Sequence, residues 1–569
     1  MSLHFIDFEV FSNDWLCVII NPQRRSETVI VNDTGKLKEY YQQYKNEIFV
    51  GYNIRQYDQF IFKGLLLDFN PKDVNNWIIV KDRMGWQYSD LFRNVNINIF
   101  DIMTTFHGLK TLEGFMGNNI KETSVDFNIN RKLTAAELAE TIEYCRHDVQ
   151  QTIKVFLQRK EEFDAQMALL KEFKLPLNLI SKTKVQLSAI ILGAIRQQRN
   201  DEFDIEYPDT LRLNKYKEIK RWYDNPLNRD YEKSLEIDVA GVPHIFAWGG
   251  LHGARANYIE SGQFLNIDVA SYYPSLMLRY NWGSRNCPSL EKFKMIYDTR
   301  LKLKREGKKK EQAPYKIVLN GTYGAMKDKY NTLYDPRQAN NVCVGGQLLL
   351  LDLIEKLEGH CELIQSNTDG ILVKLHNNRE EVEAICHEWE NRSGMVLEFD
   401  EFVKVIQKDV NNYILIPKGE LYDEKGKPRW KTKGAYVKSL NSLDYDLSIL
   451  NEAVINYFVH NIPVEKTIME CDELIKFQKI VKVSSKYEYA LYRDERLNDR
   501  TLRVFASTNL SDGGVFKVKI GGNPEKFALT SERSFIINVN INNQQIPNYL
   551  DKNWYIDLAL KRVNDFLGN

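Results

Sequence analysis

Two carboxylates lie two positions apart near the start of the chain. Asp7 and Glu9 belong to LHFIDFEV (residues 3 to 10), whose alternating pattern predicts a strand. Side chains at i and i+2 point to the same side of a strand, so both acids face one site. Paired acids without a basic neighbour are costly unless they bind metal or share a proton. The pair alone favours a solvated edge strand with two surface acids, and a metal site is the alternative interpretation.

Two later segments supply more acids. Asp58 follows the predicted strand IFVGYN, in a segment that begins at Asn53, while Tyr144 and Asp148 are four apart on one face of a predicted helix. Two divalent cations held by such acids activate water and stabilise the leaving oxygen of a phosphodiester. The predicted ligands are Asp7, Glu9, Asp58 and Asp148, and Tyr144 would orient the attacking water.

A second pair of acids lies in the other half of the chain. Asp268 ends the apolar stretch FLNIDVA, and Asp369 lies in Ser-Asn-Thr-Asp-Gly, inside a predicted hairpin over residues 361 to 375. Each has an ordinary interpretation, because Asp is common at strand ends and Asn-Thr-Asp-Gly is good turn chemistry. Together, however, they could supply the two carboxylates that metals bridging a triphosphate require.

Basic residues lie between these two acids. Arg300 and Lys304 share one face of a predicted helix, and Lys316, Asn320 and Tyr323 share one face of the next. Two antiparallel helices with these faces opposed would hold a triphosphate by charge. The alternative is a solvated basic face.

The N-terminal residues resemble the 3′→5′ proofreading exonuclease of family B DNA polymerases. They match its Asp-x-Glu strand, its Asn-x-x-x-Tyr-Asp segment and its Tyr-x-x-x-Asp helix, in that order. Glu143 occupies the position where one subclass of this nuclease fold has a histidine. The sequence therefore favours the other subclass, which has a tyrosine. The resemblance implies that Asn53 contacts DNA, and Phe100-Asp101 is interpreted as structural.

The C-terminal half resembles the polymerase motifs of the same family. Asp268-Val-Ala-Ser-Tyr272-Tyr273-Pro274-Ser275 resembles the first motif, and Lys316 to Gly324 resembles the motif of the fingers. The resemblance implies that Asp268 binds metal and that Tyr273 stacks under the incoming sugar and excludes a ribose 2′-OH. The implied nucleotide-binding residues are Tyr272, Tyr273, Arg300, Lys304, Lys316, Asn320 and Tyr323.

Three segments depart from the family pattern. The metal turn keeps Asp369 but has Asn367 in place of its first aspartate, so Asp268 and Asp369 remain as the metal ligands. Gly249-Gly250 resembles a Tyr-x-Gly-Gly linker without its tyrosine. The segment from Lys408 to Tyr413, followed by Lys433-Gly434, resembles the region that contacts the primer end. The implied DNA contacts are Asn53, Gly249, Gly250, Tyr413 and Lys433.

The resemblance implies a multidomain α/β and α+β protein, with an RNase H-like 3′→5′ exonuclease domain before a right-hand polymerase. The expected domains are the exonuclease (1–180), a connector (181–260), palm (261–287 and 331–440), fingers (288–330) and thumb (441–569). The short gaps between the motifs lack the insertions of protein-primed members, so a compact phage-type enzyme is expected. It would use two Mg²⁺ (or Mn²⁺) ions per active site, primer–template DNA and deoxynucleoside triphosphates, with replisome proteins as further candidate partners.

These sites need elements that position them. Helical spacing covers residues 134 to 164, with a capped start at Thr134 and Glu137. Two helices should flank the basic run from Arg300 to Lys310, another helix is expected near 448 to 460, and strands are expected from about 480 to 546.

Composition limits the class of protein. The 569 residues carry 77 basic and 77 acidic side chains, so nucleic-acid binding would depend on local clusters and not on net charge. The seven cysteines are scattered, without a C-x-x-C pair, which argues against a zinc site or a disulfide framework. No signal peptide or membrane span is predicted, so a cytoplasmic location is expected. The protein is also expected to be a monomer.

Three functions fit these observations. The first is a template-directed DNA polymerase with proofreading. The second, motivated by Asn367, is a 3′→5′ exonuclease with a degenerate, DNA-binding polymerase half. The third is a non-enzymatic clamp or packaging protein that reuses the fold, which the four nuclease acids argue against.

Overall fold

The computed structural model describes residues 2–104 and 107–568. The chain is a mixed α/β protein with several sheets, and it divides into two compact units. Unit 1 contains Met1–Lys182, Leu440–Leu450 and Ile468–Asp557, and unit 2 contains Thr183–Ser439, Asn451–Thr467 and Leu558–Asn569. The chain passes between the units within α14 (Ser448–His460), α15 (Val464–Glu470) and α16 (Lys552–Leu567). The predicted helix over 448–460 is thus confirmed.

The N-terminal part of unit 1 is built on a five-stranded mixed sheet of order β3-β2-β1-β4-β5. Its strands are β1 (Leu3–Val10), β2 (Trp15–Asn21), β3 (Ser26–Val31), β4 (Ile48–Gly51) and β5 (Ile99–Asp101). The central strand β1 runs antiparallel to β2 and parallel to β4. Ile6 and Phe8 enter the core on one side of β1, whereas the ring of Phe5 packs against Phe156 of α5 on the other.

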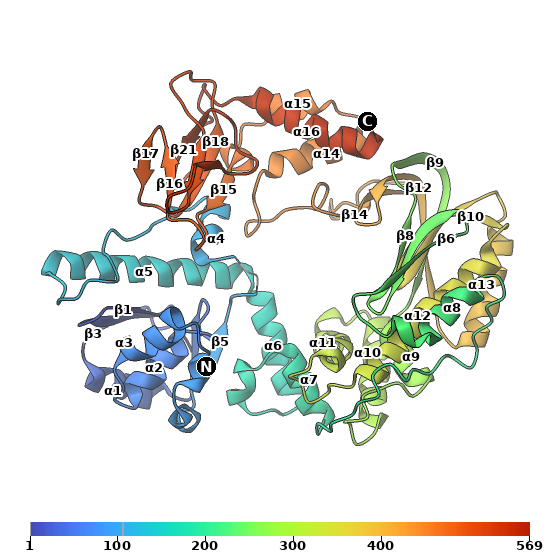
Figure 1. Ribbon diagram of the computed structural model, residues 1–569, viewed down its shortest axis with the longest axis horizontal. Coiled ribbons are helices and arrows are strands. Elements are labelled where there is room, and N and C mark those ends of the chain that lie inside the picture. Colours follow the sequence, from blue (N-terminus) through green and yellow to red (C-terminus); the bar gives the residue numbers. More distant parts are fainter. Residues whose placement is uncertain (1, 105–106, 569) are drawn as a thin grey trace. The chain divides into compact units, whose positions relative to one another are not determined.

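Helices cover this sheet on two faces. They are α1 (Thr34–Tyr44), α2 (Asp58–Leu66), α3 (Pro71–Asn75), α5 (Ala135–Gln158) and α6 (Lys160–Glu172), and Figure 1 shows α5 along one face of the sheet and α1 to α3 on the other. A further helix, α4 (Leu109–Phe115), packs against α5 and the C-terminal part of the unit. The capping box at Thr134 and Glu137 is confirmed. The helical stretch expected over 134–164 is two helices, because Arg159 leaves the helical region (ψ 15°) and donates its guanidinium to the Ile102 carbonyl.

The C-terminal part of unit 1 is β-rich, as its sequence predicts. It holds one sheet of order β15-β18-β21 and another of order β17-β16-β19-β20. The strands are β15 (Lys479–Lys482), β16 (Tyr489–Tyr492), β17 (Glu495–Leu497), β18 (Thr501–Ala506), β19 (Val515–Val518), β20 (Glu525–Lys526) and β21 (Ser534–Ile536). This part packs against the N-terminal part of the same unit, because the Glu122 carboxylate accepts the backbone N–H groups of Arg500 and Thr501, each at 2.9 Å.

Unit 2 is built on a nine-stranded antiparallel sheet of order β14-β13-β12-β9-β11-β10-β8-β7-β6. The strands are β6 (Ser234–Val239), β7 (Val242–Ala247), β8 (Gly250–Ala254), β9 (Tyr258–Val269), β10 (Cys361–Asn367), β11 (Gly370–Leu375), β12 (Leu397–Asp409), β13 (Asn412–Pro417) and β14 (Lys431–Lys433). The hairpin predicted over 361–375 is confirmed as β10 and β11, joined by Thr368 and Asp369.

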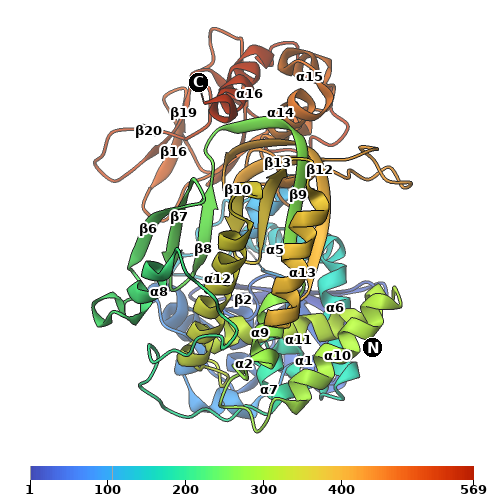
Figure 2. The same ribbon diagram turned by 90° about the vertical axis from the view of Figure 1, so that its right-hand side faces the viewer.

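Helices pack on this sheet, and Figure 2 shows α12 and α13 against its strands. The helices of unit 2 are α7 (Lys184–Leu192), α8 (Lys217–Asp224), α9 (Tyr272–Arg279), α10 (Glu291–Arg305), α11 (Lys309–Lys327), α12 (Pro336–Leu357) and α13 (Arg379–Ser393), of which α7 and α10 pack against α11. Almost every residue of α12 is buried, including the polar residues Gln338, Asn340, Asn341, Gln347 and Asp352. The two helices predicted around the basic run are α10 and α11, joined by a turn in which Gly307 has φ +70°. Across the described ranges, no helix combines the length and the apolarity needed to cross a bilayer.

The predicted domain boundaries stay predictions. Residues 181–260 hold α7, α8 and β6 to β8, and these three strands extend the nine-stranded sheet. Residues 441–569 are divided between the two units.

Candidate active sites: two carboxylate clusters

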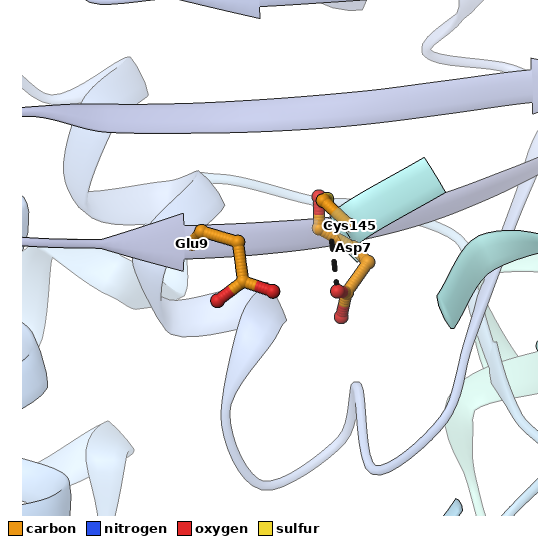
Figure 3. Close-up of side chains that lie close together, drawn as sticks. All are labelled: Asp7, Glu9 and Cys145. Carbon is orange, nitrogen blue, oxygen red and sulfur yellow. Dashed lines mark hydrogen bonds between the residues drawn. The ribbon is translucent and has the colours of Figure 1, made fainter. Parts of the chain in front are cut away.

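The first cluster lies between β1 and α5 in unit 1. Asp7 and Glu9 project from the same side of β1, as predicted, and the thiol of Cys145 on α5 reaches them. One ligand atom from each of these three residues lies within 4.8 Å of the other two. Figure 3 shows the two carboxylates side by side and the hydrogen bond that joins Cys145 to Asp7.

Asp58 adds a third carboxylate, which the preceding loop holds in place. Asn53 has φ +63°, and the Asp101 carboxylate accepts the backbone N–H groups of Asn53 and Arg55, each at 3.0 Å. Asp101 thus fixes the loop that ends where α2 begins, at Asp58. Asp58 is 3% exposed, and its Oδ1 has no hydrogen-bond partner among the described residues.

Asp148 and Tyr144 enter from α5, one helical turn apart. The Lys110 ammonium contacts the Asp148 carboxylate, lies 3.2 Å from Glu113 Oε1 and sits 4.5 Å from the centre of the Tyr144 ring. His147 Nε2 lies 3.3 Å from Glu113 Oε2 on the same side. Lys110 therefore places a positive charge at the edge of the acidic cluster.

Burial dominates the electrostatics of this cluster. Burial raises the pKa of Asp58 to about 7 and that of Asp148 to about 6, where Lys110 opposes the rise. Burial and the neighbouring carboxylates raise the pKa values of Asp7 and Glu9 well above their ordinary range. Hard divalent cations prefer closely spaced carboxylate oxygens as ligands, and Asp58 Oδ1 has no other partner among the described residues. The residues of this cluster therefore fit a metal site.

The second cluster lies in unit 2, where β9 pairs with β11. Asp268 on β9 stands opposite Gly370, the residue after Asp369. The backbone N–H of Val269 donates to the Asp369 carbonyl oxygen at 2.7 Å. The sheet therefore fixes the two aspartates beside each other, although they are 101 positions apart in the chain.

The carboxylate of Asp268 lies among polar and charged neighbours. Burial raises its pKa to about 6, while the charge of Lys431 lowers the pKa and the charge of Asp369 raises it. The Asn266 side-chain amide donates to Asp268 Oδ2 at 2.6 Å. On β12, Glu398 stands opposite Asp268, and Asp400 lies two residues further along the same strand.

A cavity of about 230 Å³ adjoins Asp369. Tyr273 and Tyr323 line it, with their ring centroids 4.2 Å apart, and Asn320 contributes to its wall. Tyr272 also lines it, but its side chain is 4% exposed and its hydroxyl donates to the Gly346 carbonyl at 2.6 Å. Tyr272 therefore positions the start of α9, while Tyr273 faces the cavity.

The basic residues of α10 are engaged within the unit. Arg300 Nη1 donates to Ser271 Oγ at 2.7 Å, and Ser271 has φ +51°, a conformation that a non-glycine residue seldom adopts. Lys304 Nζ lies 2.7 Å from Glu398 Oε1. On α11, Lys316 and Asn320 are exposed on one face, as their spacing predicts.

The departures from the family pattern lie near this site. Lys433 Nζ donates to Asn367 Oδ1 at 3.3 Å, and Lys433 stands opposite Tyr413 across β13 and β14. Gly250 lies at the start of β8, and a Cβ there would come 3.8 Å from Thr368 Oγ1 in the metal turn. A Cβ at Gly249 would meet nothing within 4 Å.

The structure also brings in residues that were not predicted. In the first cluster these are Cys145, Lys110 and Glu113, and in the second they are Glu398, Asp400 and Lys431. Glu398 and Asp400 repeat the acid-x-acid spacing of Asp7 and Glu9 on a strand, a signal that could have found them. No spacing rule connects Lys110 to Asp148, because separate helices carry them.

The fold and these sites define a multidomain α/β protein with two acidic centres, one in each unit. A comparison with models of protein families finds no match. One curated relative, the uncharacterized mitochondrial protein ymf34 of Marchantia polymorpha, is 39% identical over 70 residues, which cover 12% of this chain and 89% of the relative. The chain belongs to the same family as that protein.

One solved structure aligns with the whole chain. It is the family B DNA polymerase from the hyperthermophilic archaeon Pyrobaculum calidifontis, of which 78% is covered, with a TM-score of 0.41 and 15% sequence identity.

Proposed function

We propose that the protein is a template-directed DNA polymerase of family B with a 3′→5′ proofreading exonuclease. The observation that carries the proposal is the pairing of β9 and β11, which sets Asp268 beside Asp369 at the edge of a cavity lined by Tyr273 and Tyr323. This placement supports a polymerase site in unit 2, and the grouping of Asp7, Glu9, Asp58 and Asp148 in unit 1 supports a separate nuclease site.

The nuclease half is supported by the first cluster. Asp7, Glu9, Asp58 and Asp148 would hold two Mg²⁺ or Mn²⁺ ions, which activate water and stabilise the leaving oxygen. Burial, together with nearby carboxylates, raises the pKa of Tyr144, so its hydroxyl keeps its proton and can donate a hydrogen bond to the attacking water. Asn53, in the loop that Asp101 fixes, would contact the DNA strand.

The polymerase half is supported by the second cluster. Asp268 and Asp369 would hold the cations that neutralise the triphosphate during phosphoryl transfer. Tyr273 would lie under the sugar and exclude a ribose 2′-OH, and Asn320 and Tyr323 would line the nascent base pair. Exposed Lys316 can bind the triphosphate directly, whereas Arg300 and Lys304 must first exchange their contacts with Ser271 and Glu398.

Domain roles follow from this proposal. Residues 1–180 would form an RNase H-like exonuclease domain, and the nine-stranded sheet with α10 and α11 would form the palm and fingers. Gly249, Gly250, Tyr413 and Lys433 would contact the primer–template duplex. The short gaps from Asp268 to Lys316 and from Lys316 to Asp369 support a phage-type enzyme without protein-priming insertions.

One labelled primer–template tests the proposal. With Mg²⁺ and deoxynucleotides the protein should extend the primer, and without deoxynucleotides it should shorten the primer from its 3′ end. Absence of both activities at several Mg²⁺ and Mn²⁺ concentrations would reject the proposal.

A second candidate function is a 3′→5′ exonuclease whose polymerase half only binds DNA. Asn367 favours it, because an amide oxygen paired with Lys433 supplies no negative charge to a metal. This alternative predicts degradation without extension by the natural chain. It also predicts that Asn367→Asp gains extension, whereas a working polymerase extends with Asn367 in place.

A further inference from the structure

The nuclease-like cluster contains a sulfur donor that neither the motifs nor the proposed function uses. Cys145 is 0% exposed, and its thiol donates to the Asp7 backbone carbonyl at 3.4 Å and to Asp7 Oδ2 at 3.7 Å. Figure 3 shows this thiol reaching Asp7 beside Glu9. Mg²⁺ and Mn²⁺ sites built from carboxylates have no need of sulfur, so the thiol gives this cluster a different range of metals.

The spacing of these donors suits a tetrahedral ion. With Zn–S near 2.3 Å and Zn–O near 2.0 Å, a sulfur and an oxygen bound to one tetrahedral zinc lie about 3.5 Å apart. Cys145 Sγ and Asp7 Oδ2 are 3.7 Å apart before any ion binds, and a Glu9 oxygen lies within 4.8 Å of both. Three ligands can therefore close on one ion with small side-chain movements.

A separate observation also points to a cation at this place. Asp58 is 3% exposed, its Oδ1 has no hydrogen-bond partner among the described residues, and its charge acts on Asp7. A buried carboxylate oxygen without a partner carries a desolvation cost that a cation would remove. A buried carboxylate with an unpartnered oxygen therefore lies near the group that Asp7, Glu9 and Cys145 form, and its charge favours a cation there.

We propose that Asp7, Glu9 and Cys145 form a binding site for thiophilic divalent cations such as Zn²⁺ or Cd²⁺, and that such an ion inhibits the nuclease-like site. Binding forms a metal–sulfur bond and breaks the S–H bond, and the proton leaves to the buffer. Mg²⁺ leaves the thiol protonated, because it prefers oxygen ligands. The proposed metal binding depends only on the residues of the cluster, whereas the proposed inhibition also rests on the proposed nuclease function.

The selectivity follows from the environment of the thiol. The Cys145 thiol is fully buried and lies against Asp7, so an ion held by Asp7 and Glu9 also meets the sulfur. Sulfur ligands select metals such as Zn²⁺ and Cd²⁺, whereas hard ions bind the carboxylate oxygens alone. Cys145 thus separates thiophilic ions from the hard ions that the proposed reaction uses.

Titration with Cd²⁺ or Co²⁺ tests the binding step without any activity measurement. The full chain should develop a sulfur-to-metal charge-transfer band at one equivalent of metal. Cys145→Ser should lose that band and release one proton fewer per bound ion, because the thiol proton is absent. The matched control is Cys17→Ala, which removes another fully buried thiol of the same sheet and should leave the band unchanged.

Primer degradation in Mg²⁺ tests the inhibition. Zn²⁺ should inhibit the natural chain at concentrations at least tenfold lower than it inhibits Cys145→Ser, with the rate of each protein compared with its own rate without Zn²⁺. Equal bands in Cys145→Ser and the natural chain, with melting temperatures that show both folded, would overturn the inference. A band that depends on Cys145 in a protein without nuclease activity would keep the metal site and reject the proposed function instead.

Discussion

Gly370 stands directly opposite Asp268, and a Cβ on Gly370 would lie 2.1 Å from Asp268 Oδ1 and 2.9 Å from the Ile267 carbonyl oxygen. The residue after the metal-turn aspartate must therefore lack a side chain if the Asp268 carboxylate is to keep its position. Gly370→Ala should displace that carboxylate and reduce primer extension at least tenfold. Degradation without deoxynucleotides should be unchanged, because the nuclease acids lie in the other unit.

The matched control is Gly513→Ala, where an added Cβ meets nothing within 4 Å. It should leave both activities at the natural level.

Overpacking at Gly370 should also cost about 1–3 kcal/mol of stability, measured by urea unfolding. Full extension by Gly370→Ala would mean that Asp268 does not act in the position described.

The two acidic clusters should be separable by mutation. Asp7→Ala combined with Glu9→Ala removes two ligands of the first cluster and should abolish degradation while extension continues. Asp268→Ala should do the reverse. Both variants are measured on the same labelled primer–template, with and without deoxynucleotides. Loss of both activities from either variant, in protein that melts like the natural chain, would contradict two independent sites.

Sugar selection should depend on the ring of Tyr273. Tyr273→Ala opens the floor of the 230 Å³ cavity and should raise the use of ribonucleotides relative to deoxynucleotides at least tenfold, measured as a ratio of kcat/KM values. Tyr273→Phe keeps the ring against Tyr323 and should retain selection. If Tyr273→Ala selects sugars as the natural chain does, the ring is not the gate.

The stability of metal-free unit 1 should depend on pH. The folded pKa of Asp58 is about 7, against roughly 3.9 in an unfolded chain, so the folded state binds more protons between these values. The stability that this proton binding contributes is complete below about pH 4 and is lost as pH rises through 7. With EDTA, the melting temperature at pH 8 should therefore lie below that at pH 6, and Mg²⁺ should restore it.

Asp58→Asn is the control for this dependence. The amide does not titrate, so the difference in melting temperature between pH 6 and pH 8 should shrink in metal-free protein. If Asp58→Asn shows as large a difference in melting temperature between pH 6 and pH 8 as the natural chain, groups other than Asp58 cause the pH dependence.

The sequence predicted those parts of the sites that depend on local periodicity. Alternation placed Asp7 and Glu9 on one side of a strand, the helical repeat placed Tyr144 one turn from Asp148, and turn chemistry placed Asp369 in a hairpin. Each inference needed only neighbours within a few positions, where backbone geometry fixes the direction of the side chain.

Contacts between distant segments could not be predicted in this way. Lys110 reaches Asp148 across two helices, and Glu398 faces Asp268 because β12 pairs with β9 over more than a hundred positions. Sheet order and register decide such pairs, and neither can be read from one strand alone. The partners of Cys145 were missed for the same reason.

Arg503 should be the strongest single link between the two parts of unit 1. Its guanidinium is fully buried, and its five N–H groups donate to Gln478 Oε1 and to the carbonyl oxygens of Gly114, Asn118, Ile537 and Val539 at 2.7–3.2 Å. Arg503→Met leaves these buried acceptors without donors and should destabilise unit 1 by about 3–5 kcal/mol. Arg503→Lys, with three donors, should lose less stability.

Hydrogen exchange should accelerate in β18 and α4 of Arg503→Met while the nine-stranded sheet of unit 2 keeps its protection. Because α4 carries Lys110, degradation should fall before extension does, and equal loss of protection in both units would contradict a link confined to unit 1.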